Sequence, residues 1–280
     1  MTSAEDSALN SRQGFLSSHP VATYFVLTYA ISWAGAFLLV APKLLQHEPV
    51  PKRVGLLMFP VMLLGPALAS IILTMMLEGT PGLRDLFNRL FGVAFPRRWY
   101  TPLLIPPVVI LAVLLCMRTF VAPVFTPNTF FVGVMFGIVA GFVEEIGWMG
   151  YAFPKMHWGR NALTTSISLG LLWSAWHLPV IDYLGTAVPH GAYWFRFLLA
   201  FTLVMTAMRV LIGWAYTNTK SVFLTQCMHA SSTGALVVLS PVGINPEQEL
   251  LWYAVYGLAL WVIVAIVVRR YGKGLTLQSA

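Results

Sequence analysis

Four ionisable side chains occur inside apolar stretches of this sequence: the adjacent Glu144 and Glu145, then His177, then His229. A charge is costly within lipid, so such residues mark functional sites by default. Two carboxylates and two imidazoles can activate a water molecule and stabilise the oxyanion that forms at an attacked carbonyl group. An apolar cavity also makes a carboxylate a better base. The set therefore favours hydrolysis of an amide bond without a covalent nucleophile.

The local spacing of these residues adds detail. The adjacent glutamates diverge by about 100° around a helix, so their carboxylates point at different atoms. Trp173 and His177 are four residues apart and share one helix face. His229 and Thr233 have the same spacing, so an imidazole and a hydroxyl face the same way and could both donate hydrogen bonds to an oxyanion.

The elements that position these residues are membrane helices. Of the 280 residues, 58% are hydrophobic and 10% are charged, and this charged fraction is far below that of a soluble domain. A spanning helix needs about 20 mostly apolar residues. The sequence predicts an all-α polytopic membrane protein with about eight such helices, at 21–40, 54–76, 103–124, 130–153, 163–181, 196–216, 222–239 and 251–268.

The domain organisation follows from these spans. We expect a polar N-terminal tail at 1–20, one transmembrane helical domain at 21–270 with its catalytic core at about 130–240, and a C-terminal tail at 271–280. Pro106 and Pro107 should kink or delay the third helix. The fourth helix is rich in glycine, which lets neighbouring helices approach closely.

The depths of the four residues are compatible with a shared cavity. With about 1.5 Å of rise per residue, Glu144 lies roughly 14 Å from the cytoplasmic end of its helix. His229 lies roughly 10–12 Å and His177 roughly 16–22 Å from the cytoplasmic starts of theirs. All three depths fall within a hydrocarbon core of about 30 Å. The depth of His177 agrees least well with the other two, so a tilted or broken helix is expected there.

The net charge of +7 is interpreted as membrane orientation rather than nucleic-acid binding. Eleven Lys and Arg residues of the predicted loops and tails lie on the side that carries both termini, and three lie on the other side. We therefore expect both termini in the cytoplasm, with the plasma membrane as the location. His19, His47, His157 and His190 fall in predicted loops or tails and are expected to be solvated.

Three short motifs around these residues resemble the CPBP family, which comprises CAAX proteases and bacteriocin-processing enzymes, also called Abi proteins. EEIGWMGY at 144–151 resembles the first motif, two glutamates followed after three residues by arginine. WSAWHLP at 173–179 is similar to the second, an aromatic residue four positions before a histidine. HASST at 229–233 resembles the third, a histidine followed after three residues by asparagine or aspartate.

The resemblance implies an intramembrane endopeptidase with a glutamate mechanism, similar to type II CAAX prenyl endopeptidases. It implies that Glu144 activates water with the help of His177, that His229 is an oxyanion donor and that Glu145 is a supporting carboxylate. No organic cofactor is implied. The expected partners are membrane lipids and a lipidated or membrane-bound peptide, and the sequence leaves the oligomeric state open.

The chain departs from the motifs at three positions. Met149 replaces the arginine of the first motif, which would pair with Glu145 one helical turn earlier. Glu145 is therefore either protonated or paired elsewhere, and Arg209 on the sixth predicted helix is the candidate partner. Thr233 replaces the usual asparagine, and its hydroxyl can still donate one hydrogen bond. Trp173 replaces the usual phenylalanine, which we interpret as a tolerated aromatic exchange.

Other functions stay open at this point. Two histidines and a glutamate form a known catalytic zinc set, although no His-Glu-x-x-His pattern is present. The departures at Met149 and Thr233 also suit a catalytically weakened membrane protein that acts in immunity or as a scaffold. A proton-coupled transporter ranks last, because no repeated half with a matching broken helix is visible.

Overall fold

The computed structural model describes Gly14 and residues 16–276, so most of the predicted N-terminal tail and the last four residues lie outside the described part. The described residues form helices and no strand. The α-helices are α2 (Pro20–Leu45), α3 (Lys52–Leu90), α4 (Ile105–Phe120), α5 (Gly133–Gly147), α6 (Phe153–His157), α7 (Ala162–Trp176), α8 (Trp194–Thr219), α9 (Val222–Leu239) and α10 (Pro246–Tyr271).

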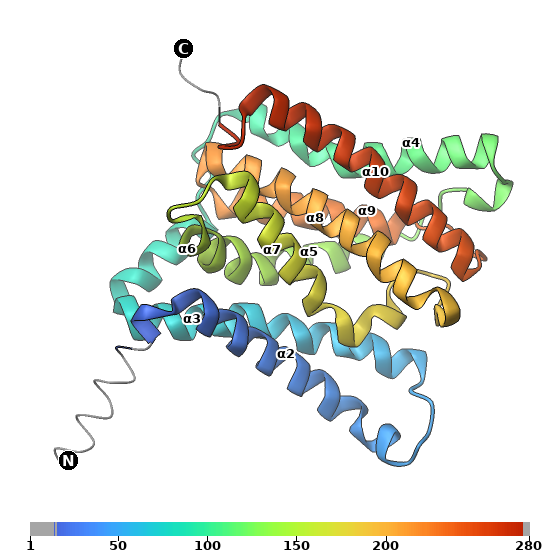
Figure 1. Ribbon diagram of the computed structural model, residues 1–280, viewed down its shortest axis with the longest axis horizontal. Coiled ribbons are helices and arrows are strands. Elements are labelled where there is room, and N and C mark those ends of the chain that lie inside the picture. The colour runs from blue at the N-terminus through green and yellow to red at the C-terminus, as the bar shows by residue number, and fades with distance from the viewer. Residues whose placement is uncertain (1–13, 15, 277–280) are drawn as a thin grey trace.

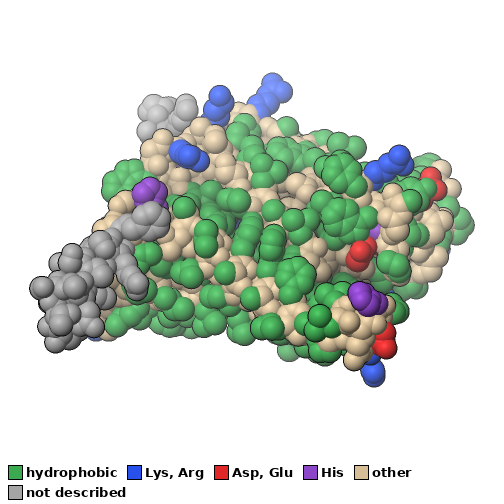
Figure 2. Space-filling view, turned by 60° about the horizontal axis from the view of Figure 1, so that its bottom comes forward, with side chains coloured by type: hydrophobic (Ala, Val, Ile, Leu, Met, Phe, Trp, Pro, Cys, Tyr) green, Lys and Arg blue, Asp and Glu red, His purple; other side chains and the backbone are tan. Residues whose placement is uncertain are grey.

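The long helices lie side by side in one bundle, and α2 begins at the end of the bundle where α10 ends (Figure 1). Within the described residues, seven helical segments are long and apolar enough to cross a membrane. Figure 2 shows hydrophobic side chains over most of one face, with charged side chains mainly toward its ends. The chain is therefore an integral membrane protein, and the all-α fold with about eight membrane helices is confirmed.

The fifth predicted span, residues 163–181, is shorter than expected. Its helix α7 has 15 residues, ends at Trp176 and continues as a 3-10 helix from Leu178 to Tyr183. Pro179 explains the change, because proline lacks an N–H group and disfavours the α conformation in the residue before it. α7 packs beside α8 inside the bundle (Figure 1). His177, the C-cap residue of α7, therefore lies among other helices.

Two further helices differ from the predicted limits. α3 runs well past residue 76 to Leu90, with a break at Gly79, whose φ of +65° suits a residue without a side chain. Pro106 and Pro107 lie in the first turn of α4, which begins at Ile105 after a 3-10 helix, so they delay the helix, one of the two expected effects, and do not kink it.

The glycines of α5 allow the closest helix contact of the site, as their spacing predicted. A Cβ atom added to Gly137 would lie 2.3 Å from the carbonyl oxygen of Ala230 on α9, and one added to Gly141 would lie 2.6 Å from the Ala230 backbone nitrogen. Only glycine permits this approach of two backbones. Glu145 follows Gly141 by one turn and His229 precedes Ala230, so this contact brings the two ionisable residues together.

Candidate active site

Glu144 and Glu145 occupy the last turn of α5, directly before a change in helix geometry. Both are buried, with exposed fractions of 3% and 0%. From Trp148 to Ala152 the chain forms a π-helix, an element that is frequent at functional sites. The two carboxylates point to different partners, as their adjacent positions predicted.

Glu144 accepts hydrogen bonds from two indole groups. Trp148 Nε1 lies 3.0 Å and Trp173 Nε1 lies 2.8 Å from the same oxygen, Oε2. Trp148 is one turn further along the chain from Glu144, whereas Trp173 comes from α7. Both donors are uncharged, so Glu144 carries no direct ion pair among the described residues.

Glu145 is bound by two groups that can carry positive charge. Arg209 Nη1 on α8 lies 2.9 Å from both of its carboxylate oxygens. His229 Nδ1 lies 2.8 Å from Oε1 of the same carboxylate. The structure thus places Arg209 in the ion pair expected for it from the sequence, while Met149, at the motif position of the arginine, is fully buried.

Trp173 also contacts the two partners of Glu145. The guanidinium carbon of Arg209 lies 4.1 Å from the centre of its ring, a cation–π contact. The His229 ring meets it edge-on at 4.9 Å between centroids. Arg209 is fully buried, and its Nε and Nη2 atoms have no hydrogen-bond partner among the described residues.

His177 lies at the C-terminal end of α7, next to this group. Its Nδ1 atom is 2.8 Å from the carbonyl oxygen of Trp173, and a carbonyl oxygen only accepts, so Nδ1 carries the proton. In the neutral ring Nε2 is then an acceptor. Trp176 and Phe201 pack edge-on against the imidazole at 4.8 and 5.1 Å and fix its plane.

Thr233 does not join the hydrogen-bonded group. It is half-buried and lies one turn after His229 on α9, as predicted. Among the described residues, however, no hydrogen bond connects its hydroxyl to either glutamate or histidine. Four of the five predicted site residues are therefore brought together, and Thr233 lies one turn after the fourth, His229, on α9.

Two tryptophans and one histidine have contacts that the sequence did not predict. Trp173 is expected only as a tolerated aromatic exchange in the second motif, yet both Trp173 and Trp148 donate to Glu144; the four-residue spacing of Glu144 and Trp148 was a signal for the second contact. His190 was expected to be solvated, which is wrong. It is 1% exposed, stacks on Phe197 at 3.7 Å and lies 3.4 Å from the buried Glu249.

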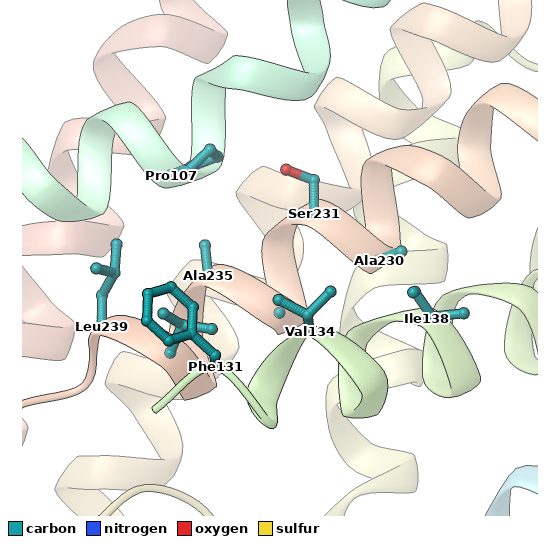
Figure 3. Close-up of a pocket in the computed structure, with 10 residues that line it drawn as sticks. Pro107, Phe131, Val134, Ile138, Ala230, Ser231, Ala235 and Leu239 are labelled. Atoms are coloured by element: carbon teal, nitrogen blue, oxygen red, sulfur yellow. The ribbon is translucent and has the colours of Figure 1, made fainter. Parts of the chain in front are cut away.

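An apolar groove of about 430 Å³ lies between α5 and α9, with Pro107 of α4 at its edge (Figure 3). Ser231 contributes a hydroxyl group, which donates to the carbonyl oxygen of Leu103. None of the five predicted site residues lines this groove in the described structure. The groove occupies a different side of α9 from the one that presents His229 to Glu145.

Comparisons with known proteins agree with the resemblance predicted from the motifs. Residues 126–235 match the family model described as type II CAAX prenyl endopeptidase Rce1-like. The chain is also 28% identical over 221 residues to CAAX prenyl protease 2 of Methanococcus maripaludis, and the match covers 73% of this chain and 78% of that relative. The matched segment is similar to an Rce1-like domain, and the two findings support a CAAX-type membrane protease, a hydrolase.

Proposed function

From this Rce1-like domain, we propose that the chain hydrolyses a peptide bond near the C-terminus of a prenylated CAAX peptide, with Glu144 as the general base. The observation that carries this proposal is the unequal environment of the two glutamates. Glu145 is held by Arg209 and His229, whereas Glu144 meets only neutral indole donors. A carboxylate without a cationic partner is the better proton acceptor.

The proposed reaction begins with water between Glu144 and the substrate carbonyl group. Glu144 accepts one proton while the water oxygen bonds to the carbonyl carbon, which forms a tetrahedral oxyanion. His177 Nε2 accepts a hydrogen bond from the same water and orients it. The protonated Glu144 then donates its proton to the leaving amide nitrogen, the C–N bond breaks, and the carboxylate is restored.

His229 is the proposed oxyanion donor. Its Nδ1 atom is engaged by Glu145, so donation to the oxyanion requires a proton on Nε2, that is, an imidazolium ion. With His229 protonated, the two carboxylates are balanced by Arg209 and His229. Buried charges are tolerated when paired and hydrogen-bonded in this way. We assign Thr233 a supporting position next to the substrate, without a direct catalytic contact.

The site is proposed to work without a resident metal ion or cofactor and to face the cytoplasm. The basic residues expected on the cytoplasmic side include Arg269 and Arg270, which lie in the last turn of α10. That end of the bundle also carries the start of α2. Positively charged loops favour the cytoplasmic side, so both termini are assigned to it, in the plasma membrane.

Cleavage of a farnesylated CAAX peptide tests the proposal. Purified protein and Glu144→Gln are incubated with the peptide and a metal chelator, and the products are identified by mass spectrometry. We expect the wild type alone to release the last three residues. Cleavage that disappears with chelator and returns with zinc would replace the proposal by a zinc mechanism. Unchanged cleavage by Glu144→Gln would remove Glu144 from its role.

A further inference from the structure

Both hydrogen bonds to Glu144 end on the same carboxylate oxygen. Trp148 and Trp173 place their Nε1 atoms 3.0 and 2.8 Å from Oε2. We infer that these two tryptophans are positioning residues that hold Glu144 by Oε2 and leave Oε1 as the oxygen that takes the proton from water. The inference rests on the proposed function, because it names the reacting atom of the proposed base.

The chemistry of the donors fixes the direction of both bonds. An indole N–H group donates and cannot accept, so each bond delivers a proton to Oε2. A carboxylate offers about four lone-pair sites over its two oxygens, and two donors on one oxygen occupy that oxygen's share. A third partner, such as water, therefore finds its free acceptor sites on Oε1.

The two donors to Glu144 come from two different elements. Trp148 is fully buried in the π-helix that follows Glu144, and its ring packs against Trp176 and Tyr24 at 5.8 and 5.9 Å between centroids. Trp173 is 3% exposed on α7, with the Arg209 guanidinium over its face. Neither indole has room to turn, so the Glu144 carboxylate is held in one orientation.

Trp173 also connects the two glutamates. Its nitrogen binds Glu144, and its face binds the same Arg209 that pairs with Glu145. A phenylalanine, the usual residue at this motif position, would keep the aromatic face and lose the N–H donor. The exchange Trp173→Phe therefore removes the proposed function of the indole while preserving most of its packing.

Infrared spectroscopy of the purified protein tests the contact without any substrate. The Glu144 carboxylate band is identified as the band that is lost in Glu144→Gln. We expect this band to shift in Trp148→Phe and in Trp173→Phe. It should stay in place in Trp261→Phe, a matched control whose indole donates to the carbonyl oxygen of Leu203 at 3.0 Å. An unshifted band in both site variants would overturn the inference, whether or not the protein cleaves the peptide.

Kinetics with the farnesylated peptide test the consequence. Each single variant should lower kcat about tenfold, and Trp148→Phe/Trp173→Phe about a hundredfold, because a hydrogen bond to a charged group is lost each time. KM should stay within about twofold of the wild-type value, and the thermal midpoint should stay close to that of Trp261→Phe. If the two tryptophans served only in packing, the thermal midpoint would fall instead. If Glu144→Gln is inactive and the double variant keeps the wild-type kcat, the positioning role of the tryptophans is refuted and the proposed function stands. If Glu144→Gln is active, the proposed function itself fails.

Discussion

Arg209 and Glu145 are 64 positions apart in the sequence, yet Nη1 of Arg209 lies 2.9 Å from both carboxylate oxygens of Glu145. Both side chains have no exposed surface. The first motif would place the arginine on the same helix as the glutamate, at the position of Met149. In this chain the charge comes from α8 instead, so the departure at Met149 does not leave Glu145 without a cation.

Removal of this arginine should destabilise the protein strongly. Arg209→Met leaves the buried Glu145 carboxylate with only His229, and breaking a buried ion pair costs about 3–5 kcal/mol. We expect a clearly lowered thermal midpoint in detergent. Arg196→Met is the matched control, because Arg196 is an exposed arginine on the same helix. Equal midpoints of the two variants would show that the Arg209 pair does not stabilise the fold.

An arginine at the motif position should compensate for this loss. Residue 149 follows Glu145 by one helical turn, the spacing at which a glutamate pairs favourably with a downstream cation. We expect Met149→Arg/Arg209→Met to recover most of the thermal midpoint and the peptide cleavage lost in Arg209→Met. Met149→Leu/Arg209→Met should recover neither. If Met149→Arg restored neither the thermal midpoint nor cleavage, the conclusion that Arg209 replaces the motif arginine would be contradicted.

The close contact of α5 and α9 should tolerate no added methyl group at Gly137. The new Cβ atom would lie 2.3 Å from the Ala230 carbonyl oxygen, so the helices must separate at a cost of about 1–3 kcal/mol. We expect Gly137→Ala to lower both the thermal midpoint and cleavage, since His229 moves with α9. Gly234→Ala is the control in the same interface, because its Cβ meets no heavy atom closer than 3.6 Å. A wild-type midpoint for Gly137→Ala would refute this packing argument.

Glu249 should stabilise the loop that precedes α8. Its carboxylate accepts the backbone N–H groups of Thr186 and Ala187 at 2.7 and 2.8 Å, from the first turn of α10. Glu249→Ala leaves the buried N–H group of Ala187 and the part-buried one of Thr186 unpaired, and an unpaired buried donor costs about 1–3 kcal/mol. We expect a lowered thermal midpoint, measured beside Glu247→Ala, an exposed glutamate in the same turn. Identical midpoints would show that the loop does not need this acceptor.

Much of the architecture could be predicted from hydropathy alone, because a lipid environment demands long apolar helices. The glycines of α5 and the buried charges carried further information about contacts, and Arg209 could be proposed as a partner because Glu145 lacked one. The end of α7 was placed too late because hydropathy continues across Pro179, whereas helix geometry does not, although the depth of His177 had already called for a tilted or broken helix.

The hydrogen bond of Trp173 to Glu144 and the burial of His190 were beyond the sequence for a different reason. Trp173 lies on α7, which packs mainly beside α8, and its indole reaches Glu144 at the end of α5, a distance that no local pattern encodes. His190 lies in an irregular segment whose position depends on Glu249 at a remote helix start. Contacts between side chains of separate elements are set by tertiary packing.

The central claim is that the two glutamates have separate roles, Glu144 in proton transfer and Glu145 in holding Arg209 and His229. The most direct measurement compares Glu144→Gln with Glu145→Gln for peptide cleavage and thermal midpoint in one detergent. We predict that Glu144→Gln keeps the wild-type midpoint and loses about 10²-fold or more in kcat, whereas Glu145→Gln loses stability as well as activity. Wild-type kcat in Glu144→Gln, or the reverse pattern of midpoints, would contradict the account.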